Sequence, residues 1–236
     1  MIADGVRFTV DGVPVVAQAG QTIIAACDDA GIYVPRLCYR SDLPPGGECR
    51  LCTCKVNGRY AAACVTPVAA SIVVENDTPE LLAERRTIVE MLFVEGNHTC
   101  PSCEKSGDCD LQAMAYRLGL HAMQLPYQWP RRDIDATHPE VFLDRNTCIL
   151  CGLCVRASRS ADGKSAFGFE HRGAQTRIAV NAPAGLGATG VAPGDRAVSA
   201  CPVGALVVKH TGYQTPYGKR RFDEAPIGSE IESKRG

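Results

Sequence analysis

The chain has 236 residues, of which 25 are basic and 26 are acidic, so its formal net charge is −1 at neutral pH. This length suits one or two domains, and the balanced charge argues against nucleic acid as the main partner. No stretch reaches the roughly 18 apolar residues of a membrane span. The N-terminal stretch MIADGVRFTVDGVPV lacks the basic and apolar regions of a secretory signal. We therefore expect a cytoplasmic protein that binds neither membrane nor nucleic acid.

Cysteine is the unusual residue in this composition, with 13 copies. A cytoplasmic chain keeps its thiols reduced, and an odd number of cysteines fits a disulfide framework poorly. Dense cysteine in this setting indicates metal binding.

The N-terminal third carries the signals of a small sheet domain. An Asp-Gly pair and an Asn-Gly pair each separate two strand-like runs, which is typical of tight β-hairpins. The elements predicted in chain order are strands at 6–10 and 13–17, a helix at 21–31, a hairpin turning at Asn57-Gly58 and a strand at 71–75. Together they predict a β-grasp-like, ferredoxin-like domain over residues 1–77.

The remaining two thirds alternate helical patterns with loops rich in Gly, Pro and Cys. Thr78 and Pro79 mark the start of the clearest helix, and Gly96 marks its end. The further elements predicted are a helix at 110–119, a Pro-containing connector at 120–145, a loop running into a helix at 148–159, and a turn before a strand at 201–209. We expect a helical segment with its connector over 78–134 and a second ferredoxin-like domain over 135–210. The tail, 211–236, is expected to lie along a partner or to remain mobile.

The first ligand set lies in the loop after the first predicted helix and in the hairpin that follows. It consists of Cys38, Cys49, Cys52 and Cys64. Four thiolates converging from a Gly/Pro-rich loop suit a two-iron cluster, because glycine lets the backbone close around the inorganic core. A zinc site is the alternative, since C-x2-C also occurs in zinc knuckles. For Cys27 and Cys54 we expect packing roles in the core.

The C-terminal set begins with C-x2-C-x2-C, in which three thiolates on one loop hold three corners of a cubane cluster. Its members are Cys148, Cys151 and Cys154. In two-cluster bacterial ferredoxins a fourth cysteine follows after three further residues, stands before a proline and serves the other cluster. Ser158 occupies that position here, so the fourth ligand is predicted to be Cys201, which precedes Pro202. This pattern predicts one 4Fe-4S cluster.

The middle set lies in NHTCPSCEKSGDCDLQ, residues 97–112, and combines His98 with Cys100, Cys103 and Cys109. Zinc also takes one histidine with three cysteines. Two other predicted cluster sets in the same chain favour a His-ligated 4Fe-4S cluster here, because neighbouring clusters form an electron path. Imidazole is neutral where a thiolate is negative, so this ligand should raise the reduction potential. The three sets use eleven of the 13 cysteines.

A glycine-rich stretch, GLGATG at 185–190, matches G-x-G-x-x-G. It lacks the preceding strand, the following helix and the acidic residue about twenty positions later that a dinucleotide site needs. We interpret it as a flexible loop. We therefore expect no site for FMN or NAD and no catalytic residue on this chain.

The order of a two-iron set, a His/Cys set and C-x2-C-x2-C followed by CPVGAL resembles the N-terminal part of the large iron–sulfur subunit of respiratory complex I. It also resembles the N-terminal extensions of iron-only hydrogenases. The similarity is strongest to the diaphorase iron–sulfur (gamma) subunits of soluble NAD-reducing nickel–iron hydrogenases. EGNHTCPSCEKSGDCDLQ has the single residue between His98 and Cys100 that is typical of the hydrogenase form, whereas complex I relatives usually have three.

This resemblance implies an α+β electron-transfer subunit of an oxidoreductase complex, with one 2Fe-2S and two 4Fe-4S clusters. The implied partners are a flavoprotein diaphorase subunit, which binds FMN and NAD, and the small and large hydrogenase subunits. The same subunit of an NAD-linked formate dehydrogenase or of an NADP-reducing hydrogenase remains an alternative, because the electron path is the same. A structural module held together by zinc is the alternative from a different class.

Overall fold

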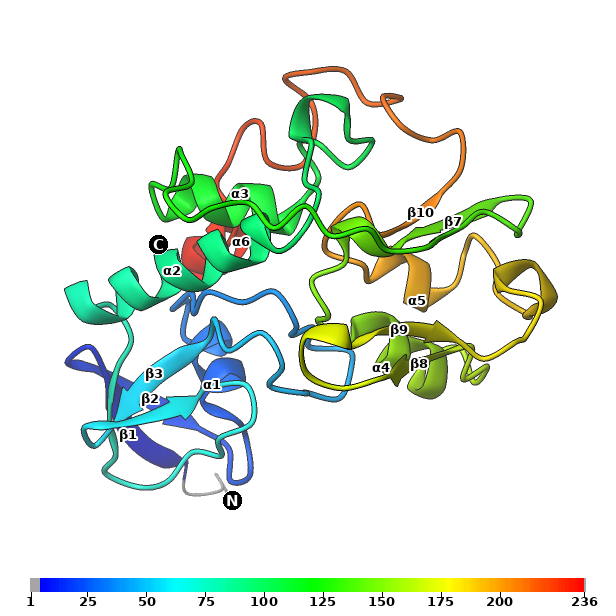
Figure 1. Cartoon of the computed structure of the whole chain (residues 1–236). Helices are drawn as coiled ribbons and strands as arrows, with labels where there is room; N and C mark the ends of the chain where they lie inside the picture. Colours follow the sequence, from blue (N-terminus) through cyan, green and yellow to red (C-terminus); the bar gives the residue numbers. More distant parts are fainter. Residues whose placement is uncertain (1–4, 236) are drawn as a thin grey trace.

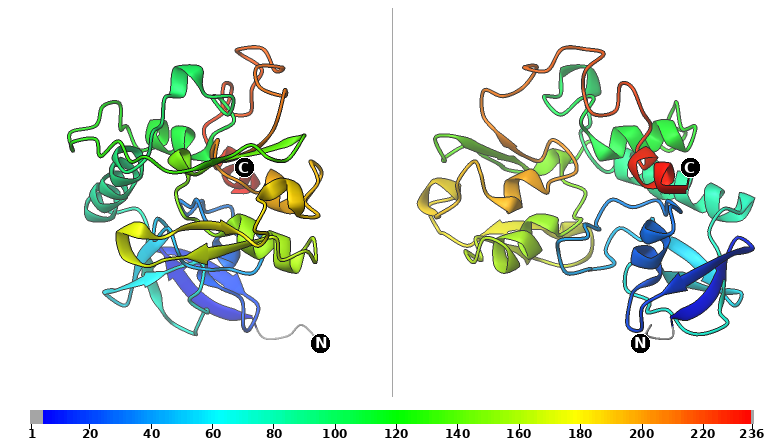
Figure 2. Two further views of the ribbon diagram at one scale, coloured as in Figure 1. Left: turned by 45° about the vertical axis from the view of Figure 1, so that its right-hand side comes forward. Right: turned by 180° about the vertical axis from the view of Figure 1, so that it is seen from behind.

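A computed structural model describes residues 5–235 and shows a mixed α/β chain (Figures 1 and 2). The N-terminal part is a five-stranded sheet of order β2-β1-β5-β3-β4, in which β1 and β5 run parallel and the other neighbours run antiparallel. Its elements are β1 (Val6–Val10), β2 (Val13–Ala17), α1 (Ile23–Asp29), β3 (Thr53–Val56), β4 (Arg59–Ala62) and β5 (Val73–Glu75).

The two predicted hairpins of this domain are confirmed. Asp11 and Gly12 have φ values of 48° and 78°, and Asn57 and Gly58 have φ values of 48° and 77°. Positive φ at both central residues defines the type I′ turn, whose twist matches that of the flanking strands. Thr22 caps α1, because its hydroxyl oxygen accepts a hydrogen bond from the amide of Ala25.

Two helices follow the sheet and pack against each other. They are α2 (Pro79–Val94) and α3 (Asp110–Arg117), with a short 3₁₀ turn, η1 (Cys100–Ser102), between them. Thr78 caps α2 through the amide of Leu81, as its position before Pro79 predicts.

The C-terminal part consists of two small sheets with short helices. One sheet has the order β10-β7-β6 and the other pairs β8 with β9. The elements are β6 (Ile134–Asp135), β7 (Val141–Asp144), η2 (Arg145–Thr147), α4 (Leu153–Ser160), β8 (Phe167–Glu170), η3 (Gly173–Gln175), β9 (Arg177–Val180), η4 (Leu186–Ala188), α5 (Arg196–Ser199) and β10 (Leu206–Val208). The short strands β6 and β9 pair with their chain neighbours β7 and β8. They lie in regions where the sequence pattern indicates only connector and loop, because runs of two and four residues show too little alternation.

The tail folds back on the chain itself, a contact that the sequence pattern does not indicate. It ends in α6 (Ser229–Glu232) and η5 (Ser233–Arg235), and α6 lies beside α3 and above α1 (Figures 1 and 2). Arg117 of α3 pairs with Glu232, and Lys234 donates a hydrogen bond of 3.0 Å to the carbonyl of Asp28. The tail therefore connects the N-terminal domain with the helical segment.

Candidate metal centres

The thiols of the first set lie in the loop between α1 and β3 and just after β4. The Sγ atom of Cys38 accepts a hydrogen bond of 3.4 Å from the amide of Cys49. Hydrogen bonds with Cys49 and Cys64 lower the pKa of the Cys38 thiol, and Cys64 likewise lowers the pKa of Cys52 to about 7. These pairs, Cys49 with Cys38, Cys38 with Cys64 and Cys64 with Cys52, link all four thiols, which therefore fit a compact two-iron cluster.

The C-terminal set lines a small cavity whose other walls are mostly aliphatic. Its four thiols are Cys148, Cys151, Cys154 and Cys201. Burial raises the pKa of each thiol, to about 11 for Cys148. Backbone amides oppose that effect: Leu150 donates to the Sγ of Cys148 at 3.4 Å, and the Val203 amide also faces the Sγ of Cys201. Four buried thiols with N–H donors around them suit a cubane, whose sulfurs accept such hydrogen bonds.

The middle set is spread along the turn between α2 and α3. Cys109 lies at the N-terminus of α3, where the amides of Gln112 and Leu111 favour its thiolate, although burial raises the pKa to about 12. The amide of Cys103 donates to the carbonyl of Cys100 at 3.2 Å, which places these two cysteines at the two ends of one 3₁₀ turn. This arrangement leaves the fourth position of the set to a residue outside the turn.

His98 has the chemistry of that fourth ligand. Its Nε2 atom is buried and has no hydrogen-bond partner within the described residues. Burial lowers the pKa of the imidazole to about 4, so the ring is neutral at physiological pH. The ring packs edge-on against Phe93, with 5.4 Å between ring centroids. A buried nitrogen lone pair without a donor is what a metal ligand requires. The sequence prediction of His98 as a ligand remains a prediction.

Two residues outside the ligand sets, Arg156 and Gly204, bring the C-terminal set close to both of the other sets. Arg156 of α4 donates from Nη2 to the carbonyl of Cys38 at 2.6 Å and to the carbonyl of Cys151 at 3.3 Å. On the other side, the Cα of Gly204 lies against the middle set, since a Cβ there would be 2.8 Å from the Sγ of Cys103. Figure 1 shows the loop after α1 reaching from the N-terminal sheet toward α4. Sequence reasoning missed Arg156, because one arginine after a C-x2-C-x2-C motif carries no distinguishing signal.

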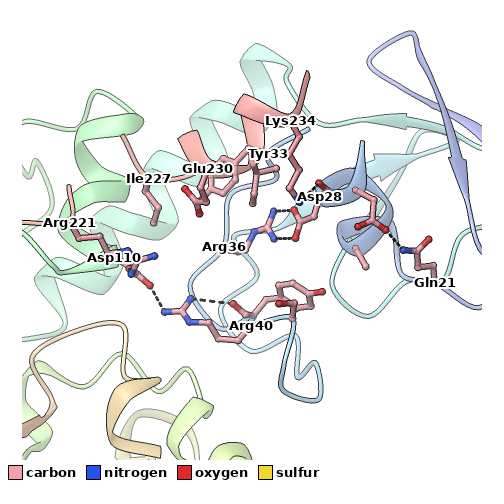
Figure 3. A pocket seen from close by; sticks show the side chains of 15 residues that line it. Gln21, Asp28, Tyr33, Arg36, Arg40, Asp110, Arg221, Ile227, Glu230 and Lys234 are labelled. Atoms are coloured by element: carbon pink, nitrogen blue, oxygen red, sulfur yellow. Dashed lines mark hydrogen bonds and ion pairs between the residues drawn. The ribbon is translucent and has the colours of Figure 1, made fainter. Parts of the chain in front are cut away.

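A cavity of about 420 Å³ lies where the N-terminal domain, α3 and the tail meet (Figure 3). Asp110, whose side chain is 2% exposed, pairs there with both Arg40 and Arg221, and Asp28 receives both Nη atoms of Arg36. These charged side chains pair with one another, and their ion pairs connect three parts of the chain. The cavity therefore has no unpaired excess of charge that would bind an ionic substrate.

The two remaining cysteines are buried in the core of the N-terminal domain. Cys27 on α1 and Cys54 on β3 are each fully buried, and the Cys54 thiol donates to the carbonyl of Ala61 at 3.5 Å. Burial raises the pKa of both thiols to about 12. This environment agrees with the packing role that the sequence predicts for them.

The glycine-rich stretch at 185–190 is held in place by neighbouring side chains. The amide of Leu186 donates to Asp135 at 2.8 Å, and the amide of Gly187 donates to the hydroxyl of Thr137 at 2.9 Å. These amides are committed to protein acceptors, unlike the amides of a loop that binds phosphate. The loop is therefore ordered, which corrects the expectation of flexibility.

Comparisons with known proteins agree with this organisation. Residues 3–79 match the family described as the 2Fe-2S iron-sulfur cluster binding domain, and residues 85–123 match the NADH-ubiquinone oxidoreductase-G iron-sulfur binding region. Residues 141–208 match the 4Fe-4S single cluster domain. The chain is 40% identical over 221 residues to the NAD-reducing hydrogenase HoxS subunit gamma of Cupriavidus necator, covering 92% of this chain and 93% of that protein. The chain belongs to the gamma subunits of NAD-reducing hydrogenases.

A solved structure supports this membership of the gamma-subunit family. A chain in the crystal structure of NAD⁺-reducing [NiFe]-hydrogenase in the H2-reduced state superposes with a TM-score of 0.92 at 46% identity. The superposition covers 96% of this gamma subunit and 98% of that chain. The resemblance to hydrogenase gamma subunits that the sequence indicates is thereby confirmed.

More distant similarity extends to complex I. The mitochondrial NADH-ubiquinone oxidoreductase 78 kDa subunit of Candida albicans is 33% identical over 233 residues, which cover 97% of this gamma subunit and 32% of the fungal protein. The gamma subunit thus spans about a third of that relative. None of its helices within residues 5–235 has the length and hydrophobicity that a bilayer crossing needs.

Proposed function

We propose that this chain relays electrons between a nickel–iron hydrogenase module and an FMN- and NAD-binding diaphorase subunit in the cytoplasm. The observation that carries the proposal is that the first and the C-terminal ligand sets each gather at one place in a chain that belongs to the gamma subunits. The chain would act as part of a hydrogen:NAD⁺ oxidoreductase, in contact with the diaphorase subunit and the hydrogenase small and large subunits. It would itself convert no substrate.

Each cluster is assigned to one ligand set and one region. A 2Fe-2S cluster is assigned to Cys38, Cys49, Cys52 and Cys64 in residues 1–77. One 4Fe-4S cluster is assigned to His98, Cys100, Cys103 and Cys109 in residues 78–134, and a second to Cys148, Cys151, Cys154 and Cys201 in residues 135–210, with 211–236 as the tail. The mutual contacts of the first four thiols, the unpaired His98 nitrogen and the cavity lined by the last four support these assignments. The mixed sheet with α1 beside it supports a β-grasp ferredoxin-like first domain.

The electron order that we propose differs from the order along the sequence. Arg156 touches the backbone of a ligand in both the first and the C-terminal set, and Gly204 brings the C-terminal set against Cys103. The first and middle sets are joined less directly, through the Arg40 side chain to Asp110, which is a neighbour of Cys109. The C-terminal cluster therefore stands between the other two. Bound clusters supply the one-electron chemistry, while the protein excludes water and donates N–H groups to sulfur.

Metal analysis tests the proposal directly. The purified, anaerobically handled chain should hold about ten irons with matching labile sulfide. Stoichiometric zinc with little iron would contradict it and would favour the structural zinc module. Copurification with nickel–iron hydrogenase subunits is expected, whereas a molybdenum enzyme in their place would move the chain to a formate dehydrogenase.

Replacing His98 tests the middle cluster separately. His98→Cys should retain a cubane but lower its reduction potential, because a neutral ligand becomes a negative one. The exposed His121 provides the control, since His121→Cys should leave every potential unchanged. An unchanged redox titration of His98→Cys would mean that His98 binds no iron.

A further inference from the structure

Arg156 forms a contact between two of the proposed cluster sites. Its Nη2 reaches the carbonyls of Cys38 and Cys151, and its Nη1 forms an ion pair with Glu48, which precedes the ligand Cys49. The Arg156 side chain is 14% exposed and the Glu48 side chain 28%. A largely buried guanidinium is therefore held on the backbone of both sets at once.

Two glycines, one from each domain, make room for this ion pair. A Cβ at Gly46 would collide with both Glu48 and Arg156. A Cβ at Gly152 would lie 2.9 Å from the Nη1 of Arg156 and 2.9 Å from the Oε1 of Glu48, and Gly152 has a φ of +66°. The close approach of the two domains thus depends on missing side chains on both sides of the pair.

One donor of the guanidinium has no acceptor. The Nε atom of Arg156 is buried and makes no hydrogen bond within the described residues, although the other two nitrogens are satisfied. A buried N–H without an acceptor is costly in an interior that is otherwise satisfied. Cluster sulfurs accept hydrogen bonds, and the same guanidinium contacts the backbone of a ligand in each of two sets.

We propose that Arg156 is a positioning residue that fixes the contact between the 2Fe-2S and the C-terminal 4Fe-4S sites and raises the reduction potential of both clusters. The inference rests on the proposed function. Its physical basis is the charge: an added electron makes either cluster more negative, and a nearby buried cation stabilises that reduced form. Glu48 has the opposite sign and should act in the opposite direction, although its greater exposure weakens its effect.

Four variants of the intact chain test this, with the potentials followed by EPR-monitored redox titration. Arg156→Gln should lower the potentials of the two-iron centre and the C-terminal cubane, shifting each reduction equilibrium about tenfold, which is 59 mV for a one-electron couple. Glu48→Gln should raise both potentials. The double variant should return toward the wild-type values, and Arg156→Lys, which keeps the charge, should stay near them.

The outcomes separate an electrostatic role from a structural one. A shift of the same sign in Arg156→Gln and Glu48→Gln, or equal shifts in Arg156→Gln and Arg156→Lys, would overturn the proposal, because only the fork geometry would then matter. Unchanged potentials in fully loaded variants would overturn it as well. Should Arg156→Gln fail to load iron, Glu48→Gln still decides the sign, and Arg156→Lys still shows whether the charge alone maintains the potentials. Absence of iron from the wild-type chain would contradict the proposed function itself and is read separately from these shifts.

Discussion

The Nε2 atom of His98 lies directly over the backbone of Gly96, because a Cβ built on Gly96 would be only 2.5 Å away. Gly96 is buried and follows the end of α2. The two residues are therefore matched: the imidazole occupies the volume that any other residue at position 96 would fill with its side chain. The sequence suggests that Gly96 ends a helix. The structure adds a second reason for glycine at this position, because a side chain there would displace the His98 ring.

Gly96→Ala should displace the His98 ring and disturb the middle cubane. Its φ is not in the left-handed region, so the backbone tolerates alanine and the effect is steric. We expect a changed EPR signal or lost iron for that cluster only. The control is Gly190→Ala, where an added Cβ meets nothing within 4 Å. Normal spectra of both variants would show that ring placement does not depend on Gly96.

Arg85 of α2 holds the first domain against the helical segment. It is 2% exposed and donates to the carbonyls of Leu51, Thr53 and Asn76 and to the side chain of Asn76. Arg85→Leu leaves these acceptors unpaired and should lower the free energy of unfolding by about 3 to 5 kcal/mol.

The neighbouring Arg86 is the matched control for that measurement. It is exposed and makes one hydrogen bond, to the carbonyl of Leu118. Arg86→Leu should cost about 1 kcal/mol in denaturant unfolding of the loaded chain. Equal decreases in the free energy of unfolding in the two variants would mean that the buried hydrogen bonds of Arg85 stabilise the fold no more than the single exposed one of Arg86.

The cysteines outside the three sets should be dispensable for iron. Cys27→Ala and Cys54→Ala remove buried sulfur atoms from the core of the first domain and should cost about 1 kcal/mol each. Their iron content should remain at the wild-type value. Cys52→Ala, by contrast, should lose about two irons. Loss of two irons in Cys54→Ala, with retention in Cys52→Ala, would reassign the ligand.

The tail is held by a contact between Gly228 and the ring of Tyr33. Gly228 has a φ of +96°, and a Cβ there would lie 2.5 Å from the ring. Gly228→Ala should release α6, so that the rate of amide hydrogen exchange across 226–235 rises at least tenfold. This corresponds to a loss of roughly 1.4 kcal/mol in the free energy of local opening.

Gly218→Ala is the control for this release. Gly218 has a similar φ of +84°, but an added Cβ meets nothing within 4 Å. Exchange across 226–235 should stay at the wild-type rate in this variant. Equal protection of the segment in both variants would show that Tyr33 does not anchor the tail.

Local features of the chain were predictable because their causes are local. The two hairpins follow from Asp-Gly and Asn-Gly, and the starts of α1 and α2 follow from the hydroxyls of Thr22 and Thr78. The strands β6 and β9 were not predictable because runs of two and four residues show too little alternation. The path of the tail was not predictable because it depends on contacts between distant segments, such as Arg117 with Glu232, which no short pattern records.

The amino-acid sequence alone indicated the family and predicted the three ligand sets, because thiol and imidazole spacing reflects the chemistry of a cluster. The spatial arrangement of the three sets becomes visible only in the folded chain. Arg156 and Gly204 place the C-terminal set in contact with the first and the middle sets, against the order of the chain. This spatial order of the sets depends on packing between domains. The guanidinium of Arg156 and the absence of a side chain at Gly204 determine how closely the sites approach one another.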